Sequence, residues 1–125
     1  MKEILAVIRM DKIGKTKQAL LEAGIPCITA RKVLGRGKKP VALVAGDTMN
    51  FQSSAVDVQD LTPGVHRLIP KRMINLMIED AELPKCLEAI FSVNSQGRPG
   101  DGKIFVMDLD DAIRVRTGES GSAAL

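Results

Sequence analysis

The chain has few aromatic residues and few residues suited to covalent chemistry. Its 125 residues include three phenylalanines, no tryptophan and no tyrosine. The two cysteines, Cys27 and Cys86, lie far apart without a CxxC pair, which favours reduced, buried thiols over a disulfide or a metal site. No run of about 18 apolar residues occurs, and residues 1–5 do not open a signal peptide. We therefore expect a cytosolic protein without membrane insertion.

Positive charge is clustered along the chain, although the formal net charge is only +3. Three groups of cations flank glycine-rich stretches: Arg31, Lys32, Arg36, Lys38 and Lys39; then Arg67, Lys71 and Arg72; then Arg98, Lys103, Arg114 and Arg116. Such groups indicate an anionic ligand, although a solvated charged face is the commoner explanation.

The two halves of the chain share one plan of strand, acidic helix start, helix, glycine and strand. The predicted elements are a strand over 3–10, a helix from Asp11 to Gly24, a strand over 27–34, a strand over 71–79, a helix from Asp80 to Gly97, and a strand over 103–107. This βαββαβ order predicts a single α+β, ferredoxin-like domain over residues 1–125, with four antiparallel strands and both helices on one face. The other face of the sheet must be covered, which predicts self-association.

Two stretches do not fit the repeated plan. Residues 35–70 are rich in glycine and proline and have no sustained period, and a connection this long is usually functional or disordered. A short strand near 41–45 is compatible with this stretch. Residues 112–116 predict a short final strand, followed by a small, polar tail from Thr117.

Three short motifs could bind phosphate. The segment from Gly97 to Lys103 spells G-x-x-x-x-G-K, but a helix precedes it and a strand follows, so it is not a P-loop. Its backbone N–H groups and Lys103 could still approach an anion, although a plain turn is equally compatible. Strand alternation would place Arg114 and Arg116 on one face, where a phosphate could bridge them. The third motif is the basic turn over residues 35–39.

The remaining polar residues give no catalytic set. His66 has no evident nucleophile to activate. Asp108, Asp110 and Asp111 could bind a metal ion, but a solvated acidic turn is favoured. RNA-binding modules of βαββαβ order stack bases on aromatic side chains, and residues 71–79 contain none, so nucleic-acid binding is not expected.

Several motifs together resemble the PII signal proteins. The segments Gly-Asp-Gly-Lys-Ile-Phe-Val at 100–106 and Ile-Arg-Val-Arg-Thr-Gly-Glu at 113–119 carry the resemblance, with Ala23-Gly24, Thr29 and Gly35-x-Gly37 in support. The length of the 36–70 stretch, its end at 69–73 and residues 110–113 resemble the nitrogenase-associated branch.

The resemblance implies a trimer whose sheets face inward, with ATP or ADP in the clefts between subunits and no enzymatic activity. Residues 36–70 would form the T-loop, which contacts partner proteins. ATP with Mg would recruit 2-oxoglutarate, and the target would be a nitrogenase component, reached as a homotrimer or beside a second PII-like chain. The implied nucleotide site comprises Thr29, Gly35, Arg36, Gly37, Lys38, Gly100, Asp101, Gly102, Lys103, Arg114 and Arg116. Lys39 and Lys71 are the implied 2-oxoglutarate residues, and no side chain is assigned to a metal.

The sequence also departs from the family pattern. Lys39 stands where PII proteins usually have a glutamine that helps to hold Mg and 2-oxoglutarate, Pro40 follows it, and Gln96 replaces a threonine. Because the chain has no tyrosine, uridylylation of a loop tyrosine is excluded. Three hypotheses remain: a sensor of nucleotide and 2-oxoglutarate that controls nitrogenase, an adenylate-only sensor for a target such as a transporter, and a small phosphohydrolase.

Overall fold

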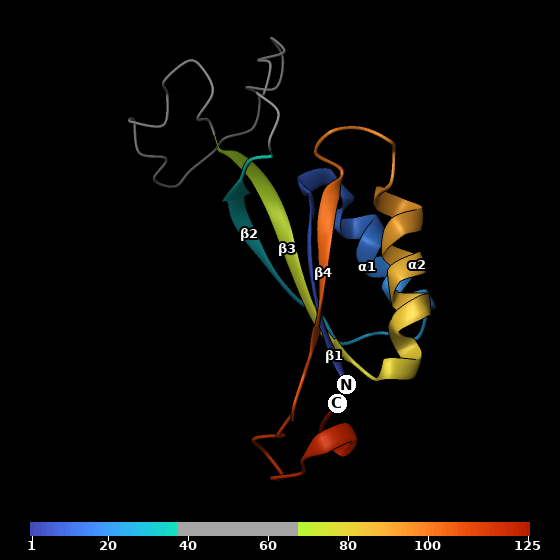
Figure 1. The fold of residues 1–125 in the computed structure, drawn as a ribbon, viewed down its shortest axis with the longest axis vertical. Coiled ribbons are helices and arrows are strands. Elements are labelled where there is room, and N and C mark those ends of the chain that lie inside the picture. The colour runs from blue at the N-terminus through green and yellow to red at the C-terminus, as the bar shows by residue number, and fades with distance from the viewer. Residues whose placement is uncertain (38–67) are drawn as a thin grey trace.

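The computed structural model describes residues 1–37 and 68–125. Within them the strands and helices are β1 (Lys2–Arg9), α1 (Ile13–Glu22), β2 (Thr29–Gly35), β3 (Ile69–Ile78), α2 (Leu83–Asn94) and β4 (Gly102–Asp108). Short 3-10 turns lie at Met10–Lys12, Asp80–Glu82 and Gly121–Ala124. The strands form one antiparallel sheet in the order β2-β3-β1-β4, with both helices on one side (Figure 1). The predicted α+β, ferredoxin-like βαββαβ fold is confirmed.

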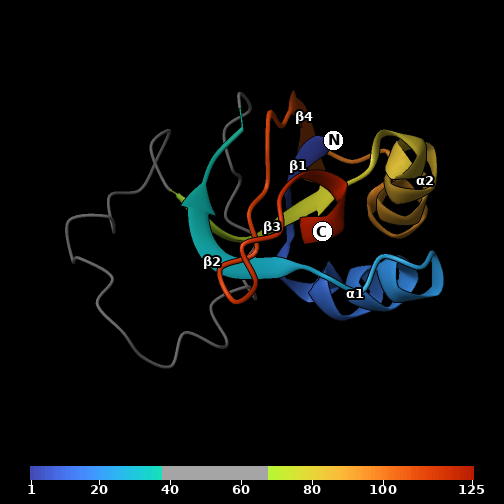
Figure 2. The same ribbon diagram turned by 90° about the horizontal axis from the view of Figure 1, so that it is seen from below.

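Side-chain alternation along β1 and β3 builds the core. Ile4, Ala6 and Ile8 of β1 are buried, and in the antiparallel register Leu76 and Ile74 lie opposite Ile4 and Ala6. Leu20 of α1, with Cys86 and Ile90 of α2, completes this layer. Seen from below the strands, α1 and α2 lie together beside the sheet (Figure 2).

The same alternation leaves apolar side chains on the face opposite the helices. Leu5 of β1 lies opposite Phe105 of β4, and Val7 lies opposite Met73 of β3. Phe105 is 47% exposed and Met77 is 42% exposed. This face also carries polar residues such as Glu3 and Asn75, but exposed apolar side chains of this size are typical of an interaction surface.

The helix ends agree with the sequence only in part. Gly24 follows α1 with φ of +78°, as expected of a helix-ending glycine. Asp11 and Asp80 were predicted to cap the helices, and this was wrong. α1 has no side-chain cap, and Asp11 lies within the preceding 3-10 turn.

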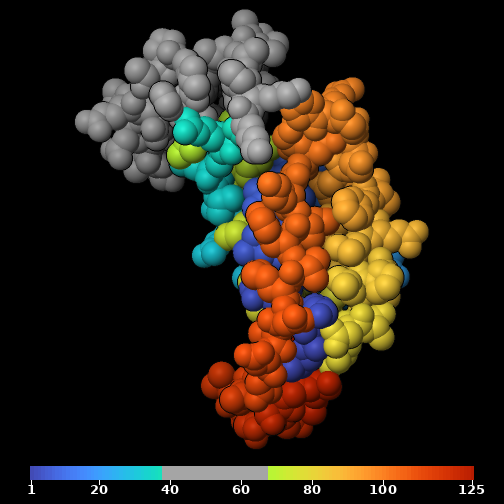
Figure 3. All heavy atoms as spheres, in the orientation of Figure 1, coloured from blue at the N-terminus to red at the C-terminus, as the bar shows by residue number. Residues whose placement is uncertain are grey.

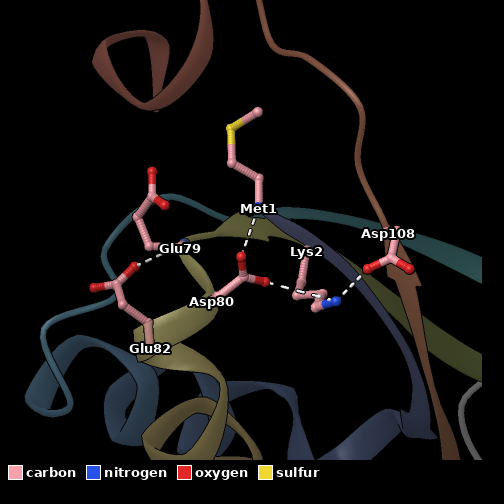
Figure 4. A network of polar contacts seen from close by, with 6 residues as sticks. All are labelled: Met1, Lys2, Glu79, Asp80, Glu82 and Asp108. Carbon is pink, nitrogen blue, oxygen red and sulfur yellow. Dashed lines mark hydrogen bonds and ion pairs between the residues drawn. The ribbon is translucent and has the colours of Figure 1, made fainter.

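Asp80 binds the start of the chain instead. Its carboxylate accepts a hydrogen bond from the Met1 amine at 3.1 Å and lies 3.6 Å from Lys2, which also pairs with Asp108 (Figure 4). The hydrogen bond from the Met1 amine lowers the pKa of Asp80. The N–H of Glu79 donates to the Glu82 carboxylate at 3.3 Å at the start of this turn. Strand pairing explains the difference, because it brings Lys2 at the start of β1, and with it the Met1 amine, to the end of β3.

The predicted strand over 112–116 does not form. Ile113 and Ser120 share one isolated antiparallel bridge, and the N–H of Gly118 donates to the carbonyl of Arg114 at 2.7 Å. Gly118 has φ of +74°, which closes a tight turn where an extended strand was expected. Arg114 and Arg116 therefore do not lie side by side on a strand face.

The remaining expectations have mixed outcomes. Both cysteines are free thiols, but Cys27 is exposed, whereas burial of Cys86 raises its pKa to about 11. The possible strand near 41–45 and most of the expected T-loop lie outside the described residues. No helix in the described ranges is long and apolar enough to cross a membrane.

Candidate functional site

A glycine-rich turn joins the end of α2 to the start of β4. Gly97, Gly100 and Gly102 all have positive φ values. Gly102 has φ of +137°, and a Cβ built there would lie 2.3 Å from the carbonyl oxygen of Val7. Only glycine therefore lets the turn approach β1 this closely.

Asp101 organises the turn from within. Its carboxylate accepts hydrogen bonds from the backbone N–H groups of Gln96 at 2.7 Å and Arg98 at 3.1 Å. These bonds, followed by the contact with Arg9, hold the pKa of Asp101 below its usual value. The carboxylate thus uses two N–H groups that would otherwise be free to bind an anion.

Two cations from the sheet hold the outside of the turn. Arg9 and Lys71 lie opposite each other in the β1–β3 register. Arg9 Nη2 donates to the Pro99 carbonyl at 2.8 Å and lies 3.4 Å from Asp101 Oδ1, while Lys71 Nζ donates to the Gly100 carbonyl at 2.7 Å. We call Arg9 and Lys71 the cation pair.

The surroundings of the cation pair disfavour the charged form of Lys71. Burial, and next the neighbouring Arg9, lower the pKa of Lys71. The Arg9 Nε is buried without a hydrogen-bond partner among the described residues. Backbone carbonyls are weaker partners for cations than carboxylates or phosphates. An anion that reached this end of the sheet could therefore replace them.

Space beside the cation pair depends on a second glycine. A Cβ at Gly100 would lie 3.4 Å from Lys71 Nζ and 3.5 Å from Arg9 Nη2. Lys103 follows the turn on the apolar face of the sheet, with its Nζ 6.0 Å from the Phe105 ring centroid. These positions bring together Gly100, Asp101, Gly102, Lys103 and Lys71 of the sequence-predicted set.

The other predicted residues lie outside this cluster, although Gly35 is at the same end of the sheet. β4 runs from Gly102 to Asp108, a rise of about 20 Å. The C-terminal segment, which includes Arg114 and Arg116, follows β4 and lies beyond its far end (red in Figure 3). Gly35 is at the end of β2, separated from β4 by β3 and β1, or about 14 Å. Thr29 is exposed at the opposite end of β2. The described part of one chain thus presents the candidate residues in separate groups: the glycine turn with Lys71, Gly35, Thr29, and the pair Arg114 and Arg116.

The comparison with known proteins identifies the family to which the chain belongs. Residues 1–119 match the family described as Nitrogen regulatory protein P-II. The chain belongs to the PII family. Members are non-enzymatic regulators that typically form trimers and generally bind ATP or ADP and 2-oxoglutarate.

Curated PII relatives match along their whole length. "Nitrogen fixation nifHD region GlnB-like protein 2" of Methanothermobacter marburgensis is 42% identical, with all of both chains covered. A protein of the same description from Methanococcus maripaludis is 45% identical, also with full coverage of both chains. "Nitrogen regulatory protein P-II" of Rhodospirillum rubrum is 38% identical over the full length of both. The resemblance to PII proteins is confirmed.

The sequence analysis missed Arg9 as a site residue of this PII protein. Arg9 sits between an apolar strand and Met10, and no motif marks it. The signal lies in pairing, since the antiparallel register puts the last residue of β1 opposite Lys71. Arg36 and Gly37 follow β2 and are exposed, whereas Lys38 and Lys39 lie outside the described residues. Among residues 1–37 and 68–125, no three acidic, histidine or cysteine side chains are grouped to hold a metal ion.

Substituting alanine for Gly102 tests the close approach of the turn to β1. We expect Gly102→Ala to lower the free energy of unfolding by about 1–3 kcal/mol from backbone strain, with the Val7 clash adding to it. Gly97→Ala is the matched control, because Gly97 also has positive φ but no heavy atom lies near its added Cβ. Urea denaturation of both variants provides the comparison, and equal losses would contradict the clash.

The hydrogen bonds to Asp101 predict an acid-sensitive contribution to stability. Because folding lowers its pKa, the carboxylate stabilises the native state fully above the unfolded value of about 3.9. That contribution is lost as the pH falls through the lower, folded value. The stability difference between the unchanged protein and Asp101→Asn should therefore be constant above about pH 5 and shrink below it. Urea unfolding at a series of pH values measures this, and a difference independent of pH would refute it.

Proposed function

We propose that this PII protein senses ATP or ADP together with 2-oxoglutarate and controls nitrogenase through residues 36–70, the T-loop. The observation that carries the proposal is the cation pair, with Arg9 and Lys71 bound to adjacent carbonyls of the glycine turn at 2.8 and 2.7 Å. The family binds these ligands generally. The printed descriptions of the relatives from Methanothermobacter marburgensis and Methanococcus maripaludis favour a role in nitrogen fixation.

The cation pair suits a carboxylate of 2-oxoglutarate. One carboxylate can accept from the Arg9 guanidinium and the Lys71 ammonium together, in place of the carbonyls of Pro99 and Gly100. A bound carboxylate would favour the charged form of Lys71, which burial and Arg9 disfavour in the unliganded chain. Lys39 would add a third cation or, alternatively, repel the Mg that accompanies ATP.

The nucleotide would lie between subunits. Gly100, Gly102 and Lys103 of one chain, with Gly35, Arg36, Gly37 and Lys38, would meet Arg114, Arg116 and Thr29 of a neighbour. Their separation within one chain supports this arrangement, because no single ligand of nucleotide size contacts all of them. The exposed apolar face of the sheet, which includes Phe105 and Met77, supports the burial of that face in a homotrimer or beside a second PII-like chain. We place the assembly in the cytoplasm, as for other PII proteins.

The ligands would control nitrogenase by shifting the T-loop between states. A ligand changes such an equilibrium only by as much as its affinities for the two states differ. Gly35 and Ile69 lie opposite each other where β2 and β3 meet the loop, and Lys71 lies two residues beyond Ile69. A carboxylate bound to Lys71 would thus act next to the base of the loop.

An adenylate-only sensor is the second candidate function. Lys39 in place of the customary glutamine favours it, and so does the engagement of the cation pair by the protein's own carbonyls. Such a sensor would report ATP and ADP to another target, such as a transporter. The phosphohydrolase hypothesis is set aside, because PII proteins are non-enzymatic regulators.

Calorimetric titration with Mg and ATP, with and without 2-oxoglutarate, separates the two candidates. We expect 2-oxoglutarate to lower the Kd for ATP by roughly 5–150-fold, the usual range of coupling. Arg9→Gln and Lys71→Gln should each remove most of this effect while ATP alone still binds. Lys17→Gln, at an exposed lysine of α1, is the control and should retain the coupling. Equal ATP affinity with and without 2-oxoglutarate in the unchanged protein would favour the adenylate-only sensor.

A nitrogenase assay tests the proposed target. Purified nitrogenase should lose most of its activity when the PII protein is added with ATP, together with its companion chain where one is required. Because the T-loop is the proposed contact, replacement of residues 40–66 by a short Gly-Ser linker should abolish the inhibition without abolishing ATP binding. Full nitrogenase activity in the presence of a saturating excess of the ATP-bound protein would reject this target.

A further inference from the structure

The side chain of Arg114 is held inside its own chain by three hydrogen bonds. Its Nη1 lies 2.5 Å from Glu119 Oε2, and its Nη2 donates to the carbonyls of Ala123 at 2.8 Å and Leu125 at 3.2 Å. Three acceptors thus share the two terminal nitrogens that would grip a phosphate. A guanidinium held in this way must be released before it can form paired bonds to another anion.

The segment that holds Arg114 is itself well defined. The N–H of Arg114 donates to the Glu119 carbonyl at 2.8 Å, and the Thr117 hydroxyl donates to the Glu119 carboxylate at 2.7 Å. The N–H of Gly121 donates to the Ala112 carbonyl at 3.0 Å and to Asp111 Oδ1 at 2.8 Å. Residues 117–124 therefore fold back over Arg114 as one closed unit, which we call the C-terminal latch.

Arg116 contrasts with Arg114. It is exposed, and among the described residues no hydrogen bond or ion pair engages its side chain. Its neighbour Val115 is 98% exposed, so this part of the turn projects from the chain. Of the two arginines assigned to phosphate, one is available and the other is held by a carboxylate.

We propose that Glu119 competes with nucleotide phosphate for Arg114, so that the C-terminal latch sets the affinity of the site. This inference rests on the proposed nucleotide-binding function. The Glu119 carboxylate neutralises Arg114 in the structure. On nucleotide binding, phosphate oxygens take its place. Displacement of the carboxylate removes one of the three contacts that tie Arg114 to the C-terminal latch, and it thereby couples nucleotide binding to the conformation of this end of the chain.

The size of the effect follows from the exposure of the ion pair. Arg114 and Glu119 side chains are 36% and 46% exposed, and an exposed pair stabilises its closed form only modestly. Removing the charge of Glu119 should therefore tighten ATP binding by about two- to fivefold. A larger gain is not expected, because the carbonyls of Ala123 and Leu125 still hold Arg114.

A double-mutant cycle on the full chain tests this competition. ATP affinity is measured by calorimetry for the unchanged protein, Glu119→Gln, Arg114→Gln and the double variant. Glu119→Gln should bind ATP about two- to fivefold more tightly, Arg114→Gln should bind it more weakly, and Glu119→Gln should give no gain when Arg114 is absent. Glu119→Ala is a second variant, because glutamine can still accept a hydrogen bond from Arg114. Asp110→Asn is the matched control, since it removes a nearby exposed carboxylate that does not touch Arg114.

The outcomes distinguish this inference from the function on which it rests. No ATP binding by the unchanged protein would overturn both. Normal binding with no gain in Glu119→Gln and Glu119→Ala would overturn only the competition. An equal gain in Asp110→Asn, or a gain that persists without Arg114, would replace it with a general effect of negative charge.

Discussion

The register of β1 between β3 and β4 is the constraint on which the rest of the structure depends. Because successive side chains of a strand point to opposite faces, one register decides three things together. It buries Ile4, Ala6 and Ile8 under the helices, leaves Leu5 and Val7 on the apolar face, and sets Arg9 opposite Lys71. A slip of one residue would exchange the two faces and separate the cation pair, so the core and the candidate site share one determinant.

Electrostatics at the glycine turn follow from that register. Arg9 and Lys71 repel each other, and Asp101, the carboxylate that contacts Arg9, also accepts hydrogen bonds from two backbone N–H groups of the turn. The turn is therefore held closed by carbonyls and one shared carboxylate rather than by full neutralisation. An anion that bound here would add the negative charge that the backbone carbonyls lack, which suits the proposed sensing of charged metabolites.

Sequence patterns predicted the elements of the fold well because the patterns report local physics. Strand alternation and helix periodicity placed β1, β3, α1 and α2 within a few residues, and Gly24 marked a helix end. The errors came from contacts between distant segments. Asp80 forms an ion pair with the Met1 amine, and Arg9 becomes a candidate site residue only because it lies opposite Lys71. Arg114 pairs with Glu119 in a turn, where residues 112–116 were expected to form a strand. Cys27 is exposed, as are the first four residues of β2 that follow shortly after it. The candidate site was recoverable only in part, since Lys38 and Lys39 lie outside the described residues and the remaining groups meet only if chains assemble.

Lys103 lies at the start of β4 and Arg114 lies beyond its end, and this separation affects how many ligands the assembled protein binds and how tightly. In the proposed assembly every nucleotide site is made of parts from two chains, so binding and assembly draw on the same free energy. Dilution that separates subunits would then weaken nucleotide binding, and bound nucleotide would hold subunits together. Where a second PII-like chain takes part, each site would combine the turn of one polypeptide with the arginines of another. The number and affinity of the sites would then depend on the ratio in which the two chains are made.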